Sequence, residues 1–201
     1  MPTNDASEKR ERRSPKRIAW TILILVAFGS LLGIGIATRP PASDADLPRR
    51  DDPATIDPFP DAPIGYRVGQ RAPDFTLPSL AGDTVALSDF RGDVVILDFW
   101  ASWCGPCRSS MPTLHAMSQA LDVVLLGVSL DRSEQAAAGY LETQSYDHMI
   151  AVWGSFADAS AVALEFGVSG IPRTFVIDRH GIVRFANHPL LLTSDLVEAL
   201  L

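Results

Sequence analysis

The chain has 201 residues, of which 47% are hydrophobic and 20% charged, which fits one globular domain with appendages. Residues 1–38 carry six Lys or Arg and three acids, whereas residues 39–201 carry 11 Arg, no Lys and 21 Asp or Glu. So acidic a domain is a poor candidate for nucleic-acid binding, which depends on neutralising phosphates with basic side chains. Only two cysteines are present, too few for a disulfide scaffold or a structural zinc site.

An apolar segment near the N-terminus predicts a membrane-spanning helix. Residues 18–38 contain no charged side chain, and as a helix they extend about 31 Å, close to the hydrocarbon thickness of a bilayer. The six basic residues in 1–17 favour a cytoplasmic N-terminus and an extracytoplasmic, periplasmic or outer-face location for the rest. A cleaved signal peptide is the alternative, but its apolar core is usually shorter. We therefore expect a single-pass anchor in the cell membrane.

Residues 39–64 are predicted to form a linker. They contain seven prolines and many aspartates. Proline restricts φ, and like charges extend the chain, so a semi-extended spacer is expected that buries no apolar core. The pattern changes at residue 65, where we expect one folded domain that continues to residue 201.

From residue 65 onward, strand-like runs alternate with helical stretches. Short strands at 74–77 and 84–87 are expected to form an N-terminal β-hairpin. The nearly continuous apolar runs at 94–100 and 123–130 are typical of strands buried on both faces. The other expected elements are strands at 149–153, 174–178 and 182–186, and helices at 104–121, 133–143, 158–166 and 194–201. This order predicts an α/β fold with a central mixed sheet flanked by helices.

A Trp-Cys-Gly-Pro-Cys motif that begins at Trp103 is the strongest signal for function. It places Cys104 where a buried strand ends and a helix begins, and the unpaired N–H groups and dipole there favour a thiolate, the form that attacks disulfides. Cys107 lies one helical turn later and can resolve a mixed disulfide on Cys104. Gly105 and Pro106 suit the first turn of the helix. Trp103 would offer a flat apolar surface to a partner.

This motif resembles that of the thioredoxin superfamily, and other positions agree with it. The resemblance implies that Asp98, six positions before Cys104, is a buried carboxylate that exchanges protons with Cys107. Desolvation should favour its neutral form. Ile171-Pro172 resembles the cis-proline loop of the family, which packs against the cysteines and pairs with the backbone of a bound partner. A cis X–Pro bond is uncommon, so where it occurs it is a specific feature of the fold.

The anchor, the expected hairpin, and an extra helix and strand between Asp131 and Trp153 look like the TlpA/ResA-type membrane-anchored thioredoxins. This resemblance covers about residues 66–201. It implies a thioredoxin-like fold and a thiol-disulfide oxidoreductase whose redox group is the Cys104–Cys107 disulfide, with no other cofactor and no metal. It also implies protein disulfides as substrates. A reductant outside the cytoplasm needs a supply of electrons, so we expect a membrane thiol-reductase as electron donor.

Two positions depart from members of that group that act in cytochrome c maturation. Those members often carry Asn or another neutral residue where this chain has Asp98, and some carry Glu where it has Ser110. The site therefore looks more like a general thioredoxin. The motif, shared with reducing thioredoxins, favours a reductant of disulfides in exported proteins, with apocytochrome c as one possible client.

Two other functions would use the same cysteine pair. A thiol pair suits Cu(I), and a copper chaperone would add a third ligand. Candidates by residue type are Met111, His115, His180 and His188, of which His115 and His180 are expected to be solvated surface residues. The segment VGQRAPDFTLPSLAG also resembles peroxiredoxins, which place Thr or Ser and Pro just before the reactive cysteine. Here residues 99–103 contain no proline, so thiol peroxidase activity is the less favoured alternative.

Overall fold

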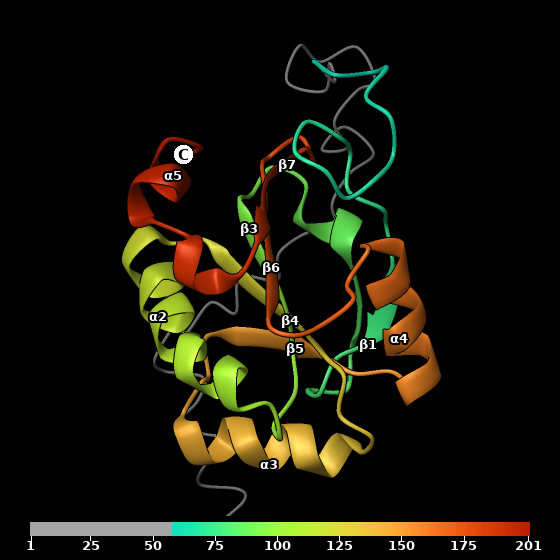
Figure 1. Cartoon of the computed structure of the whole chain (residues 1–201), viewed down its shortest axis with the longest axis vertical. Coiled ribbons are helices and arrows are strands. Elements are labelled where there is room, and N and C mark those ends of the chain that lie inside the picture. The colour runs from blue at the N-terminus through green and yellow to red at the C-terminus, as the bar shows by residue number, and fades with distance from the viewer. Residues whose placement is uncertain (1–57) are drawn as a thin grey trace, which may run out of the picture. The chain divides into compact units, whose positions relative to one another are not determined.

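The computed structural model describes residues 58–201. In this range a five-stranded sheet, with strand order β5-β4-β3-β6-β7, lies between two layers of helices (Figure 1). The strands β3, β4 and β5 are parallel to one another, while β6 is antiparallel to β3 and β7 is antiparallel to β6. Their bounds are Val95–Trp100, Val124–Ser129, Met149–Val152, Arg173–Ile177 and Val183–Asn187 for β3 to β7. The predicted mixed sheet flanked by helices is confirmed.

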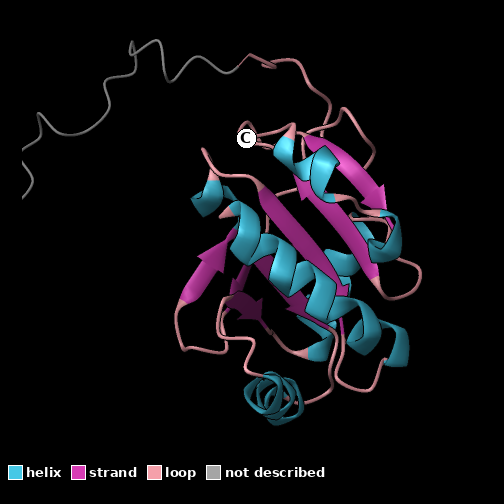
Figure 2. Ribbon diagram, turned by 90° about the vertical axis from the view of Figure 1, so that its left-hand side faces the viewer, coloured by secondary structure: helices cyan, strands magenta, loops and turns pink. Residues whose placement is uncertain are grey.

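Different elements cover the two faces of the sheet. The helices α2 (Gly105–Leu121) and α5 (Ser194–Glu198) lie on one face, and Figure 2 shows α2 running along it. The other face carries α4 (Phe156–Glu165) and the antiparallel hairpin of β1 (Thr76–Pro78) and β2 (Thr84–Ala86). The hairpin expected from the sequence is therefore present, and it helps to close the core opposite α2.

The alternation of side chains along β3 determines what faces α2. Leu97 and Phe99 belong to the core under α4, whereas Ile96 and Trp100 belong to the core under α2. Because successive side chains of a strand point to opposite faces, Asp98 points to the same face as Ile96 and Trp100. Every residue of β3 is buried, as the apolar run predicted.

The extra helix and strand expected between Asp131 and Trp153 are α3 (Glu134–Gln144) and β5. Two helix ends differ from prediction by more than one residue. Helix α4 begins at Phe156 rather than at residue 158, because Ser155 and Asp158 form a reciprocal capping box, with each backbone N–H donating to the side chain of the other. The last helix, α5, ends at Glu198, before the chain terminus. Two short 3₁₀ helices complete the domain, η2 (Leu87–Phe90) and η3 (Pro189–Leu191).

Residues 58–64 were expected to be the end of the linker, but they contact the domain. The centroid of the Phe59 ring lies 5.9 Å from that of the His180 ring and 5.3 Å from the Arg184 guanidinium. The side chain of Arg71 donates a 2.7 Å hydrogen bond to the Phe59 carbonyl. The sequence analysis did not predict this contact, because the contact depends on the single aromatic residue Phe59 and on partners far along the chain.

The expected cytoplasmic segment 1–17, the expected membrane helix 18–38 and most of the expected linker lie outside the described residues. Within residues 58–201, no helix is long and apolar enough to span a bilayer. Membrane anchoring therefore stays a prediction from the sequence.

Gly127 allows close packing beside the strand that leads to the cysteines. It pairs with Asp98 across the parallel β3–β4 ladder. A Cβ atom at this position would overlap the methyl group of Met149 and lie 2.8 Å from Trp100 Nε1. Trp100 is fully buried and has little room to move.

We expect Gly127→Ala to lower the free energy of unfolding by about 1–3 kcal/mol, the usual cost of overpacking a core, in urea denaturation followed by circular dichroism. Gly139→Ala is the matched control, since Gly139 lies in α3 with no atom within 4 Å of the added Cβ. The higher helix propensity of Ala should stabilise that variant by up to about 1 kcal/mol. Equal stabilities of the two variants would contradict the packing role of Gly127.

Candidate active site

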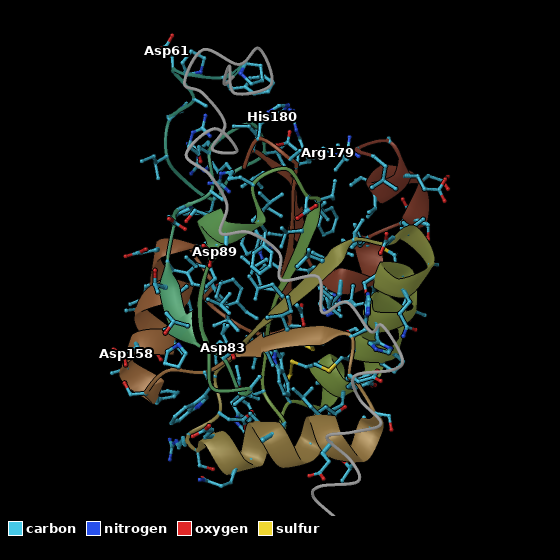
Figure 3. All side chains as sticks on the ribbon, turned by 180° about the vertical axis from the view of Figure 1, so that it is seen from behind. Asp61, Asp83, Asp89, Asp158, Arg179 and His180 are labelled. Carbon is cyan, nitrogen blue, oxygen red and sulfur yellow. A yellow bond between two sulfur atoms is a disulfide. The ribbon has the colours of Figure 1, made fainter. Side chains whose placement is uncertain are left out.

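The two cysteines lie at the N-terminal end of α2 and form a disulfide, with Cα atoms 5.3 Å apart. Figure 3 draws it in yellow, at the end of α2 that is nearer to α3. Cys104 is the N-cap residue of α2, and its Sγ accepts a 3.2 Å hydrogen bond from the backbone N–H of Cys107. Cys104 is 5% exposed, while Cys107 is fully buried. A reactant from outside therefore meets Cys104 first, and after reduction the helix N-terminus favours negative charge on its sulfur.

The predicted surface around the cysteines is also assembled. Trp103 is 66% exposed, and Gly105 and Pro106 are exposed in the first turn of α2. The Ile171–Pro172 peptide bond is cis, as the resemblance implied. Ile171 packs against the core cluster that contains both cysteines. The loop that ends in Pro172 leads into β6 beside the end of β3, so the structure brings these distant parts of the sequence to the same end of the sheet.

Asp98 lies within the core on the face of β3 that α2 covers. Its side chain is 1% exposed, and Oδ1 accepts a 2.6 Å hydrogen bond from the Thr174 hydroxyl on β6. Oδ2 has no hydrogen-bond partner among residues 58–201. Burial raises the pKa of Asp98 from its ordinary value of 3.8 to about 7, against the lowering effect of the Thr174 hydrogen bond. A carboxyl group with a pKa near neutrality can both accept and donate a proton at physiological pH.

Asp131 holds the loop that carries Trp103, a role that the sequence analysis missed. Its carboxylate accepts hydrogen bonds from the backbone N–H of Ser102 at 2.9 Å, the hydroxyl of Ser102 at 2.7 Å and the hydroxyl of Ser129 at 2.9 Å. Its backbone carbonyl accepts a 2.9 Å hydrogen bond from the indole of Trp153. The only sequence signal was an acid directly after an apolar strand. The network ties the loop before the cysteines to the ends of β4 and β5.

The histidine expected on the surface of α2 is largely buried, so that expectation was wrong. His115 has a side chain that is 14% exposed, with its ring 5.1 Å from Tyr146 and 6.4 Å from His148. The loop after α3 places both of these aromatic side chains against the His115 ring. Met111, another candidate copper ligand, is buried in the core under α2. Within residues 58–201, no group of three or more His, Cys, Asp and Glu side chains is arranged to hold a metal ion.

Comparisons with known proteins agree with this geometry. The profile of the AhpC/TSA family matches residues 68–186. The thiol:disulfide interchange protein DsbE homolog of Paracoccus denitrificans is 36% identical over 149 residues, which is 73% of this chain and 76% of the relative. The thiol-disulfide oxidoreductase ResA of Geobacillus thermodenitrificans is 33% identical over 120 residues, which is 58% of this chain and 67% of the relative.

Solved structures give the same result for the fold. The thioredoxin domain of a thiol-disulfide oxidoreductase from Bacteroides vulgatus has a TM-score of 0.59 and 27% identity to this chain, and the match covers 66% of this chain and 94% of that one. The family profile spans more than half of the present sequence. The chain thus belongs to the AhpC/TSA family and is a thiol-disulfide oxidoreductase of the ResA/DsbE type with a thioredoxin-like fold.

Proposed function

We propose that this oxidoreductase reduces disulfides in exported proteins on the outer face of the cell membrane, where residues 18–38 anchor it. The observation that carries the proposal is the arrangement of the cysteine pair, with Cys104 reached from outside at a helix N-terminus and Cys107 enclosed behind it. The basic segment followed by an uncharged apolar run supports the location. The Trp-Cys-Gly-Pro-Cys motif, shared with reducing thioredoxins, supports the direction.

The reaction is a dithiol–disulfide exchange in two steps. First, the Cys104 thiolate attacks a client disulfide, a bond forms between Cys104 and one client sulfur, and the other client sulfur leaves as a thiolate that takes up a proton. Second, Cys107 loses its proton, attacks Cys104 Sγ and releases the remaining client thiol. Two electrons have then passed to the client, and the chain holds the Cys104–Cys107 disulfide, its only redox group in this reaction.

Asp98 accepts the proton of Cys107 in the second step. Its position on the α2 side of β3 and its pKa near 7 support this role, because a carboxylate with an ordinary pKa is a much weaker base at neutral pH. The client binds over the surface formed by Trp103, Gly105 and Pro106 on one side and by the loop of Ile171 and Pro172 on the other.

A reductant outside the cytoplasm needs a supply of electrons. We propose a membrane thiol-reductase as the donor, which reduces the Cys104–Cys107 disulfide by the reverse exchange. A membrane anchor keeps the domain near such a partner and raises its effective concentration. Apocytochrome c is one candidate client through the resemblance to the TlpA/ResA group, while Asp98 and Ser110 favour a broader set of clients.

A redox titration of the full chain tests the direction of electron flow. We expect a reversible two-electron transition at about −270 mV, as in thioredoxin. Free thiols are alkylated at each potential, and the alkylated groups are counted by intact mass. A transition near about −120 mV, the value of a strong oxidant, would make the protein a disulfide donor. Failure to form an internal disulfide at any potential would favour Cu(I) binding by the cysteine pair instead.

Substitution of each cysteine tests the order of the two steps. Cys107→Ser should accumulate a mixed disulfide with client proteins, because the resolving thiol is gone, whereas Cys104→Ser should lose turnover and trap no client. The adducts are measured on non-reducing gels of membrane extracts and identified by mass spectrometry. Client adducts on Cys104→Ser but not on Cys107→Ser would reverse the assigned roles.

Asp98→Asn tests the proton transfer by rate. At pH 7 we expect disulfide reduction to slow by about tenfold or more, because general base catalysis of the second step is lost. Asp93→Asn is the matched control, since Asp93 is exposed just before the same strand and should leave the rate unchanged. A parental rate in Asp98→Asn would contradict the role of the carboxyl group.

The same pair of variants tests the cost of burying Asp98. Its pKa is higher in the folded chain, so between about pH 4 and pH 7 the folded chain binds the proton more tightly and stability falls as pH rises. The loss at higher pH amounts to up to about 4 kcal/mol. Asp98→Asn should therefore be more stable than the parent at pH 8 in urea denaturation, with the gain shrinking toward pH 4. Asp93→Asn should show no such pH dependence.

A further inference from the structure

A groove with a volume of about 710 Å³ lies beside Trp103. Its walls come from four separate parts of the chain: the loop before the cysteines, the end of β4, and the beginnings of α3 and α4. The lining side chains used below are Trp103, Leu130, Arg132, Ala136 and Phe156. We call this site the Trp103–Phe156 groove.

Large apolar side chains frame the Trp103–Phe156 groove and face solvent. Trp103 is 66% exposed and Phe156 is 48% exposed, while Leu130 and Ala136 add further apolar surface. Exposed aromatic side chains around a concave surface mark sites where another molecule binds. Trp103 directly precedes Cys104, so the groove is continuous with the surface on which the disulfide exchange takes place.

The Asp131 and Ser133 side chains that line the groove are hydrogen-bonded within the domain. The Asp131 carboxylate is satisfied by Ser102 and Ser129, and the Ser133 hydroxyl caps α3. Arg132 is exposed, and its guanidinium lies 6.0 Å from the centroid of the Phe156 ring. No carboxylate of residues 58–201 pairs with Arg132.

We propose that the Trp103–Phe156 groove binds a large apolar side chain of the client polypeptide, close to the client cysteine, and that Arg132 favours an acidic residue beside it. The inference rests on the proposed function, since a client sulfur bonded to Cys104 brings the neighbouring client residues over Trp103. The apolar walls select the apolar side chain, and the Arg132 guanidinium at the wall of the groove, which has no carboxylate partner among residues 58–201, selects the acidic neighbour. The groove thus decides which clients are reduced efficiently, while the cysteines perform the chemistry.

The test uses the full chain in detergent and four synthetic peptides, each closed by one disulfide. The peptides carry Phe or Ser beside the cysteine, followed by Glu or Lys. We expect kcat/KM to be about tenfold or more higher for the Phe peptides than for the Ser peptides, and about threefold higher for Glu than for Lys at low ionic strength. Hydroxyethyl disulfide, a small uncharged substrate that fills no groove, is the reference.

Phe156→Ala should lower the Phe-over-Ser preference about fivefold, and Phe156→Leu, which keeps an apolar wall, should retain most of it. Arg132→Ala should abolish the Glu-over-Lys preference. None of these changes should alter the reduction of hydroxyethyl disulfide, which also shows that the variants are folded.

Two substitutions away from the groove serve as matched controls and should leave both preferences unchanged. Leu164→Ala removes another exposed apolar side chain of α4, which is 76% exposed. Arg179→Ala removes an exposed arginine at the end of the domain opposite the disulfide (Figure 3).

Two results would overturn the inference while the proposed function stands: equal kcat/KM values of the parent for Phe and Ser peptides, or a preference that Leu164→Ala lowers as much as Phe156→Ala does. Equal values for Glu and Lys peptides would overturn the role of Arg132. Reduction of neither the peptides nor hydroxyethyl disulfide by the parent would instead refute the proposed function itself.

Discussion

The junction between β3 and α2 is the constraint on which the site depends. β3 is buried on both faces and held between β4 and β6, so its last residue, Trp100, has a settled position. Helix α2 starts at Gly105, which leaves Cys104 as the N-cap residue, with the backbone N–H of Cys107 donating to its sulfur. The same strand places Asp98 beneath the helix. One strand–helix connection therefore positions both the sulfur that meets the client and the buried carboxyl group.

Two buried carboxyl groups near this junction have different roles, because they accept different numbers of hydrogen bonds. Asp131 accepts three hydrogen bonds and secures the loop before the cysteines. Asp98 accepts one and keeps an oxygen without a partner, so burial raises its pKa and costs stability at neutral pH. Such under-satisfied groups are rare in cores and concentrate at functional sites. In the proposed mechanism the Asp98 carboxylate, with its raised pKa, is the base of the second step.

In the proposed function, different parts of the domain carry out the disulfide exchange and select the client. Asp98 lies on β3, Cys104 is the N-cap residue of α2, and Cys107 lies in the first turn of α2. The proposed selecting surface combines Trp103 with Arg132 and Phe156, which lie at the beginnings of α3 and α4. The extra helix α3, between β4 and β5, thus contributes to the surface beside Trp103.

The sequence by itself determined the succession of strands and helices along the chain, the mixed sheet, the cysteine pair, the buried position of Asp98 and the cis-proline loop, the last two by resemblance. These features have local signals: continuous apolar runs for buried strands, a three-residue cysteine spacing for one helical turn, and Ile171-Pro172 before a strand. Only the tertiary structure decided the Asp131 network, the burial of His115, the packing of residues 58–64 and the Trp103–Phe156 groove. Each requires residues that are distant in sequence, such as Ser102 and Asp131, to meet in space, and no local periodicity encodes such a meeting.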